Sequence, residues 1–393
     1  AMLYFERVVK DKPEASNYLA EYYYNKKDYV NYEKWAKYAA DRGISPATHN
    51  FAYYYEQKGD IENATKYYLI AAKNGDKDSK NNVILLYIER GNDDETKKIL
   101  EELGEEGTEN ELMLRKASHY KRKKEYNKRI EIYKKMIEKG AVVFGLQRVP
   151  YIARQDNREF AHLLARKKEL FVGSIPFDHV ETICKDLEKL LTTPCKPVKE
   201  YLSVTLTPTN PLIHLSGVYI DFKDYKDGDA YDKQLMFYDE WTDETSDVLL
   251  KYDSELQNIC NSIEGLDLHE VVSLRDYYES QTVHDMTKKL KSIEAFKVVK
   301  VPLINDGGKY YPDWNNRMFT EDFPFGIAVI KYFALLTKTE TPTIDKILNF
   351  YKEKTGICYF NEDGSFGPNI NESGIPALYG LDSLDKIIRF YKQ

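Results

Sequence analysis

Two short stretches of the sequence carry side chains that could do chemistry together. Residues 315–326 include Arg317 and Asp322, and residues 209–217, roughly a hundred positions earlier, include His214. An imidazole can take up and release a proton near neutral pH, a carboxylate can orient it, and a guanidinium can grip a carboxylate with two hydrogen bonds. We therefore predict that His214 is an acid/base, that Asp322 orients it, and that Arg317 binds a substrate carboxylate.

Each of these residues also has a purely structural interpretation. His214 could be a hydrogen-bonded core histidine, and Arg317 a surface or structural arginine. Asp322 and its neighbour Glu321 could cap the apolar helix that follows them, because carboxylates are favoured at helix N-termini. Asn210 precedes a proline, as turn residues often do. If its segment is helical, Asn210 lies one turn before His214 and could hold a substrate or a cofactor amide.

The residues from 201 onward predict a mainly helical domain that would position these groups. Apolar side chains at helical spacing indicate helices over 245–263, 324–336, 343–351 and 382–391. The stretch 324–336 is apolar on nearly all sides, which favours a buried central helix.

The segment 141–202 predicts a short α/β region. Residues 169–176 read as a strand and loop, and 178–191 as an amphipathic helix. A dinucleotide fold needs a Gly-x-Gly-x-x-Gly turn between a strand and a helix. We find none: Gly307-Gly308 is a loop pair, and Gly104 and Gly107 end a helical repeat. The segment is also too short for a complete nucleotide-binding sheet.

The first 140 residues repeat with a period of 32 or 33 residues. Three sets of residues share this register: Gly43, Gly75, Gly107 and Gly140; Tyr23, Tyr55, Tyr87 and Tyr120; Trp35, Tyr67, Ile99 and Ile132. Each unit predicts two helices, the second closed by a left-handed glycine. The aromatic first helix and the Ala-Ala-x-x-Gly ending resemble tetratricopeptide and Sel1-like repeats over about 14–140. Such an array could bind a partner protein or peptide, or serve as a spacer or dimerisation module.

The last 250 residues resemble a known family. The motifs are Thr207-x-x-Asn210-x-x-x-His214, Arg317-x-x-x-Glu321-Asp322-x-Pro324-x-Gly326, Thr341-Pro342-Thr343-Ile344-Asp345, and Phe144 to Tyr151. In order and separation they are similar to the opine (octopine/nopaline) dehydrogenases, over about 141–393. The stretch from Phe144 to Tyr151 looks like a late strand of that family's nucleotide-binding domain. The resemblance implies NADH- or NADPH-dependent reduction of the imine formed by an amino acid and a 2-oxo acid, with His214 and Asp322 catalytic and Arg317 and Asn210 binding substrate.

Composition restricts the other possibilities. The chain has 393 residues, with 57 basic and 64 acidic side chains, and no long basic run, which argues against a nucleic-acid partner. Its four cysteines are widely spaced, which favours reduced thiols in a cytoplasmic protein and gives no metal-site pattern. No apolar run approaches the ~18 residues of a membrane span.

The sequence thus predicts a mainly α protein with three parts: helical repeats over 1–140, a partial Rossmann-like segment over 141–202, and a helical opine-dehydrogenase-like domain over 203–393. We expect an oxidoreductase whose NAD- or NADP-binding half is not found in this chain. The alternative is a non-catalytic helical-repeat interaction module fused to a degenerate dehydrogenase domain. A third hypothesis is that the remnant dehydrogenase domain forms a homodimer and the repeats are an added arm.

Overall fold

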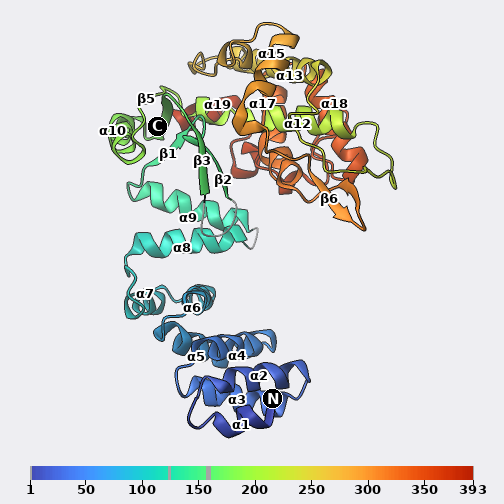
Figure 1. Cartoon of the computed structure of the whole chain (residues 1–393). Coiled ribbons are helices and arrows are strands. Elements are labelled where there is room, and N and C mark those ends of the chain that lie inside the picture. Colours follow the sequence, from blue (N-terminus) through green and yellow to red (C-terminus); the bar gives the residue numbers. More distant parts are fainter. Residues whose placement is uncertain (1, 123–124, 156–160, 393) are drawn as a thin grey trace. The chain divides into compact units, whose positions relative to one another are not determined.

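The chain folds into two compact units. A computed structural model describes residues 2–122, 125–155 and 161–392, and it divides the chain into unit 1, Ala1–Ala141, and unit 2, Val142–Gln393 (Figure 1). The further predicted boundary between residues 202 and 203 stays a prediction.

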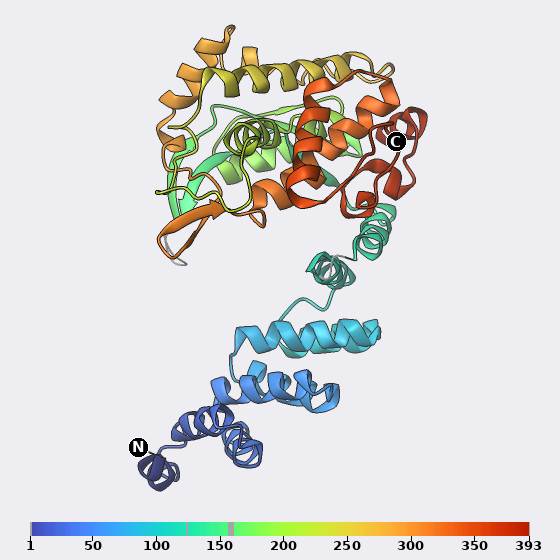
Figure 2. The same cartoon turned by 90° about the vertical axis from the view of Figure 1, so that its right-hand side faces the viewer.

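Unit 1 consists of helices joined by short turns (Figure 2). They are α1 (Met2–Val8), α2 (Ala15–Asn25), α3 (Tyr29–Ala40), α4 (Ser45–Gln57), α5 (Ile61–Lys73), α6 (Lys77–Arg90), α7 (Asp93–Glu102), α8 (Glu109–Arg122) and α9 (Tyr126–Glu138). From α2 onward, each predicted unit contains two helices. The assignment to the tetratricopeptide or Sel1-like class stays a prediction.

The second helix of each of the first three units starts at a capping residue in the 32-residue register. Asp28, Asp60 and Asn92 each accept a hydrogen bond from the backbone N–H three residues later. A cap of this kind contributes roughly 1 kcal/mol to a helix. The turn is set by the preceding residue, which has positive φ at Lys27, Gly59 and Gly91.

The predicted end of each second helix at a glycine with positive φ is confirmed at three of four positions. Gly43, Gly75 and Gly140 have φ values of 69°, 91° and 86°. The prediction for Gly107 is wrong: Gly104, with φ 72°, closes α7 instead, because this helix ends at Glu102, and Gly107 lies in the link to α8. The 32-residue spacing of the glycines therefore persists in the sequence, although α7 ends before it reaches Gly107.

Small and aromatic side chains alternate in the core of unit 1. Ala36, Ala52 and Ala64 are fully buried, as are Phe51 and Tyr68 at 0–1% exposure. The alanines let neighbouring helices approach closely while the rings fill the remaining space.

Unit 2 begins with two small sheets. One has the order β1 (Val143–Leu146), β4 (Leu170–Ile175), β5 (Cys195–Pro197), and the other pairs β2 (Tyr151–Gln155) with β3 (Ala161–Arg166). A 3-10 turn, η1 (Phe177–His179), and helix α10 (Val180–Leu191) connect β4 to its parallel neighbour β5. Apolar side chains of α10 cover one face of this sheet. The predicted strand, loop and helix over 169–191 are confirmed.

The interpretation of residues 144–151 as one late strand is wrong. The chain leaves β1 at Leu146 and enters β2 at Tyr151, in a different sheet. In addition, β1 runs antiparallel to β4, so among the described strand pairs only β4–β5 has the parallel arrangement of a dinucleotide fold. Pro150 immediately precedes the change of sheet, and a proline cannot donate the hydrogen bond that would continue a ladder.

The rest of unit 2 is mainly helical, as predicted. Its α-helices are α11 (Leu202–Thr205), α12 (Thr209–Phe222), α13 (Asp243–Asn261), α14 (Leu274–Tyr277), α15 (Val283–Ser292), α16 (Arg317–Thr320), α17 (Ala328–Thr337), α18 (Pro342–Thr355) and α19 (Leu384–Tyr391). Shorter turns are η2 (Glu294–Phe296), the π-helical η3 (Phe323–Ile327), η4 (Ile370–Glu372) and η5 (Pro376–Tyr379). The sequence did not predict the hairpin of β6 (Leu303–Asp306) and β7 (Lys309–Pro312), whose turn is Gly307-Gly308.

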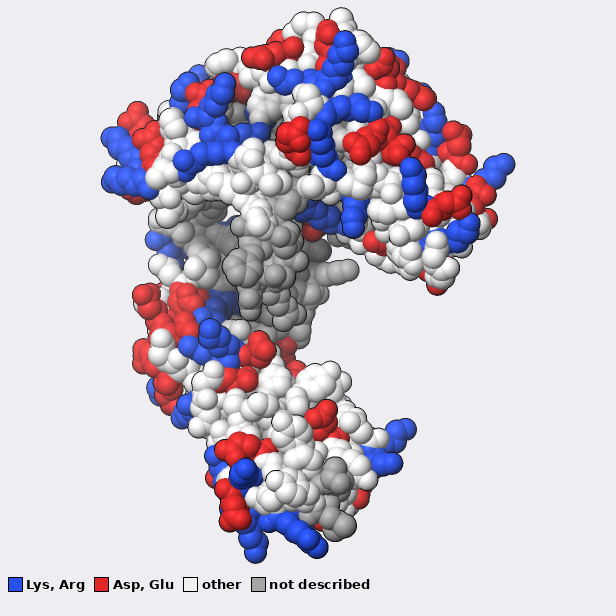
Figure 3. Space-filling model, in the orientation of Figure 1, with Lys and Arg blue, Asp and Glu red and all other residues white. Residues whose placement is uncertain are grey.

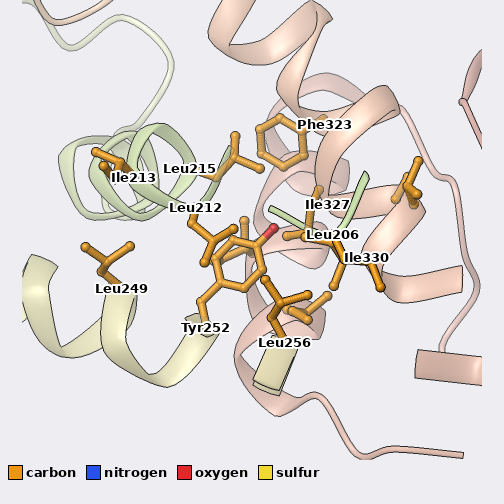
Figure 4. Packing of buried hydrophobic residues seen from close by; sticks show 14 of the residues in the cluster. Leu206, Leu212, Ile213, Leu215, Leu249, Tyr252, Leu256, Phe323, Ile327 and Ile330 are labelled. Atoms are coloured by element: carbon orange, nitrogen blue, oxygen red, sulfur yellow. The ribbon is translucent and has the colours of Figure 1, made fainter. Parts of the chain in front are cut away.

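The main core of unit 2 lies where α12, α13 and α17 meet. Figure 4 shows the Tyr252 side chain reaching from α13 in among residues of α12 and of the segment around Ile327. Phe319, Phe323 and Tyr351 stack in the same core, the last two with ring centroids 3.8 Å apart. This packing fixes the relative positions of α12 and η3.

The surface carries charges of both signs. On the face in Figure 3, Lys and Arg side chains alternate with Asp and Glu over both units. In the part of the chain with described coordinates, no helix is long and apolar enough to cross a membrane, and no group of three potential metal ligands occurs. All four cysteines are free and buried.

Candidate active site

His214 and Asp322 form a hydrogen-bonded pair. Nδ1 of His214 lies 2.7 Å from Oδ2 of Asp322, and the two residues are 108 positions apart in the sequence. Their side chains are 12% and 15% exposed, so water reaches them only partly. An ionised carboxylate can only accept a hydrogen bond, so Nδ1 carries a proton and Nε2 is left for other partners.

The pair forms because α12 and η3 approach each other closely. A side-chain carbon on Gly326 would lie 2.6 Å from Cβ and Cγ of Pro211, so only glycine allows this contact. Pro211 is one turn before His214, and Gly326 is one turn after Asp322. The two segments therefore run past each other in opposite directions, and the contact of Pro211 with Gly326 brings imidazole and carboxylate together one turn away.

Asp322 does not cap the helix that follows it. It occupies the N-cap position of η3, but its side chain makes no capping hydrogen bond and is turned to His214 instead. The predicted helix over 324–336 starts with a π turn at 323–327 before regular α17. π turns of this kind occur frequently at functional sites.

Buried aromatic side chains surround the pair. The Phe237 ring stands edge-on to the His214 imidazole, with centroids 6.1 Å apart and planes at 87°. Gly217 makes room for it, since a Cβ there would lie 2.2 Å from the Phe237 ring. Tyr252 is fully buried, and its hydroxyl has no hydrogen-bond partner among the residues that the structure describes. Burial raises the pKa of Tyr252 well above its usual value, and the nearby charge of Asp322 raises it further.

Asn210 lies on α12 together with His214, and Arg317 lies on α16, which ends two residues before Asp322. Arg317 opens α16, five residues before Asp322, and its side chain is exposed. In the residues that the structure describes, its guanidinium makes no ion pair or hydrogen bond, so it is available to a ligand. Asn210 is exposed in the first turn of α12, one turn before His214. Asn210 is therefore not a turn residue, as one interpretation had it. Its segment is helical, as its predicted role in holding a substrate or a cofactor amide requires.

Sequence reasoning missed two neighbours of the pair. Tyr252 was visible only as an apolar position of α13, and Phe237 stood in a stretch without periodicity. The available signals were the two glycines, Gly217 and Gly326, which interrupt otherwise apolar helical segments. An isolated glycine in a helix usually has a packing reason.

The described residues do not fit a dinucleotide cofactor. Pyrophosphate binding needs a glycine-rich turn from a strand into a helix, with free backbone N–H groups. The turn from β4 into α10 contains Pro176 and Asp178, of which one lacks an N–H and the other is negatively charged. Gly173 precedes this turn but packs against Val204 and Tyr201, where a Cβ would lie 2.9 Å from the valine.

Comparison with known proteins bears on the helical part of unit 2. Residues 197–355 match the family model described as NAD/NADP octopine/nopaline dehydrogenase, alpha-helical domain. Tauropine dehydrogenase of Arabella iricolor is 28% identical over 198 residues, 48% of this chain and 50% of the relative. Octopine dehydrogenase of Pecten maximus is 27% identical over 172 residues, 41% of this chain and 43% of the relative. The chain spans about half the length of these curated relatives.

Solved structures share the fold. An octopine dehydrogenase with NADH and L-arginine superposes with a TM-score of 0.55 at 24% identity, covering 63% of this chain and 64% of that one. All four predicted site residues lie inside the matched segment 197–355. The family model, the relatives and the shared fold together support an octopine dehydrogenase-like C-terminal part of this chain.

Proposed function

We propose that unit 2 is the substrate-binding and acid/base half of an opine dehydrogenase, which condenses an amino acid with a 2-oxo acid and reduces the product with NADH or NADPH. The hydrogen bond between His214 and Asp322 carries this proposal. It joins two residues of the matched helical domain and leaves Nε2 of the imidazole free for proton transfer.

His214 supplies the proton transfers in this proposal. When an amine adds to a 2-oxo acid, the carbonyl oxygen gains protons and leaves as water. Protonated Nε2 can donate such a proton and later recover one. Asp322 keeps the ring oriented through Nδ1 and stabilises the imidazolium while it is charged.

Arg317 and Asn210 bind the substrates in this proposal. Both substrates carry a carboxylate, and an exposed guanidinium without an internal partner can hold one with two parallel hydrogen bonds. The amide of Asn210, on the same face of α12 as His214, can donate to a second oxygen.

The Arg317 role can be tested without a cofactor. Octopine dehydrogenase has been solved with pyruvate, which makes pyruvate a suitable 2-oxo acid probe. We expect Arg317→Ala to weaken pyruvate binding by roughly 10- to 100-fold in calorimetric titration, the value of a charge-assisted hydrogen bond of about 1.5–3 kcal/mol. Arg389→Ala, another exposed arginine of unit 2, is the control and should bind as the wild type. Equal binding by both variants would remove Arg317 from the site.

The reaction itself can be tested by supplying the absent half. We propose that this half is provided by another chain or has been lost. NADH consumption with pyruvate and a panel of amino acids should appear only when a separately produced NADH-binding domain of an octopine dehydrogenase is added, and His214→Ala should abolish it. Failure of every such mixture, with no nucleotide bound, would contradict the proposal. NADH binding by this chain alone would contradict the proposal that its cofactor-binding half is absent.

A second candidate function is a non-catalytic interaction module. A surface hollow between helices of unit 1 favours it, since an enzyme needs no such hollow on its repeats. Under this alternative, His214→Ala would leave every activity of the protein unchanged.

A further inference from the structure

The first helices of unit 1 form an aromatic hollow. It has a volume of ≈ 240 Å³ and is lined by residues of α2, α3 and α4: Asn17, Ala20, Glu21, Tyr24, Tyr32, Ala47, Asn50, Tyr53 and Tyr54. Tyr32 and Tyr54 form its floor, at 3% and 7% exposure, whereas Tyr24 and Tyr53 are about half exposed at its rim.

The chemistry of the lining favours a cation. The face of a tyrosine ring is negative and attracts ammonium and guanidinium groups. Glu21 adds a carboxylate at the rim, exposed and without an ion pair or hydrogen bond to any described residue. The protein already uses one of these rings in this way: Nζ of Lys58 lies 4.2 Å from the Tyr54 centroid and is paired with Glu33.

A second hollow shows that the repeat does not require these residues. It lies between α6 and α8 and is lined at positions that follow those of the first by two repeats of 32, such as Asn81 after Asn17 and Ser118 after Tyr54. There, Leu85 stands at the position of Glu21, none of the lining residues is a tyrosine, and the carboxylate that does line it, Glu111, is paired with Arg115. The same helix packing thus forms without tyrosines in the lining and without an unpaired carboxylate.

We propose that the tyrosine hollow binds an arginine or lysine side chain of a partner polypeptide. The exposed rim rings of Tyr24 and Tyr53 would hold the cation and Glu21 would neutralise it. A polypeptide is the occupant because the amide side chains of Asn17 and Asn50 also line the hollow and can hydrogen-bond to the backbone that carries the basic side chain. This inference goes beyond the proposed function, and it concerns a different unit of the chain.

The test is a ligand-observed NMR titration of the full chain. The probe is the acetylated and amidated pentapeptide Ala-Ala-Arg-Ala-Ala, compared with the same peptide carrying neutral citrulline in place of arginine. We expect the citrulline peptide to bind roughly tenfold more weakly, because it has nearly the same shape and no charge. Equal binding of the two peptides, or no saturable binding of the arginine peptide, would overturn the proposal.

Variants locate the binding in the hollow. Tyr53→Leu should weaken the arginine peptide roughly 2- to 30-fold, and Tyr53→Phe should retain binding because the ring remains. Glu21→Gln should weaken it roughly two- to fivefold. Both residues are exposed, so the variants should fold, and Tyr18→Leu, an exposed tyrosine of α2 outside the hollow, is the control. Unchanged affinity in Tyr53→Leu would overturn the proposal.

Discussion

The close contact of Gly326 with Pro211 makes a quantitative prediction about the site. In Gly326→Ala, the new methyl carbon would lie 2.6 Å from two ring carbons of Pro211, whereas carbon atoms normally approach to about 3.5–4.0 Å. The proline ring is rigid, so the helix axes must separate. We expect α12 and η3 to move apart at the point that holds His214 and Asp322 together.

The expected change in the free energy of unfolding follows from two opposing effects. Overpacking a tight contact costs about 1–3 kcal/mol, and replacing glycine by alanine in a helix returns about 1 kcal/mol. The free energy of unfolding of unit 2 should therefore fall by up to about 2 kcal/mol. Urea denaturation measures it through the fluorescence of Trp241 and Trp314, the two tryptophans of unit 2.

Gly374→Ala is the matched control. A Cβ at Gly374 would lie 2.8 Å from Phe325, an equally short contact, but the Phe325 side chain is 47% exposed and can turn away. We expect a change within about 0.5 kcal/mol. If Gly326→Ala is as stable as this control, and the proton on Nδ1 of His214 keeps its downfield NMR resonance, then the close approach does not position the pair.

Two further predictions concern single carboxylates of unit 2. Asp322→Asn should abolish the downfield Nδ1 proton resonance of His214, because the 2.7 Å hydrogen bond to an ionised acceptor is lost. The circular dichroism spectrum should stay the same. A surviving resonance would show that another group orients the ring. Burial, together with the charge of Glu240, raises the pKa of Asp221 to about 7. The folded state then binds more protons than the unfolded state between about pH 4 and pH 7, so its free energy of unfolding must fall over this range, by at most about 4 kcal/mol. Asp221→Asn should remove most of that fall in urea denaturation at several pH values, and an unchanged pH profile would mean that Asp221 is ionised in the fold.

Local patterns in the sequence predicted most of the elements. The helices of unit 1 follow from a period of about 32 residues, and the structure adds capping residues in the same register at Asp28, Asp60 and Asn92. The strand and helix over 169–191 were also readable, because burial on one face leaves a periodic trace. Where packing overrides local pattern, prediction failed: Gly107 no longer ends a helix, and the stretch after Phe144 divides between two sheets.

Sequence alone specified which side chains are present and where most of the helices lie, since helix formation depends on neighbours within a few residues. It also indicated the chemistry of an imidazole with a carboxylate. The contact of His214 with Asp322, 108 residues away, and the unpaired state of Arg317 within the described residues became visible in the three-dimensional fold. Such a meeting depends on how closely two helical segments pack, which here requires the absence of a side chain at Gly326.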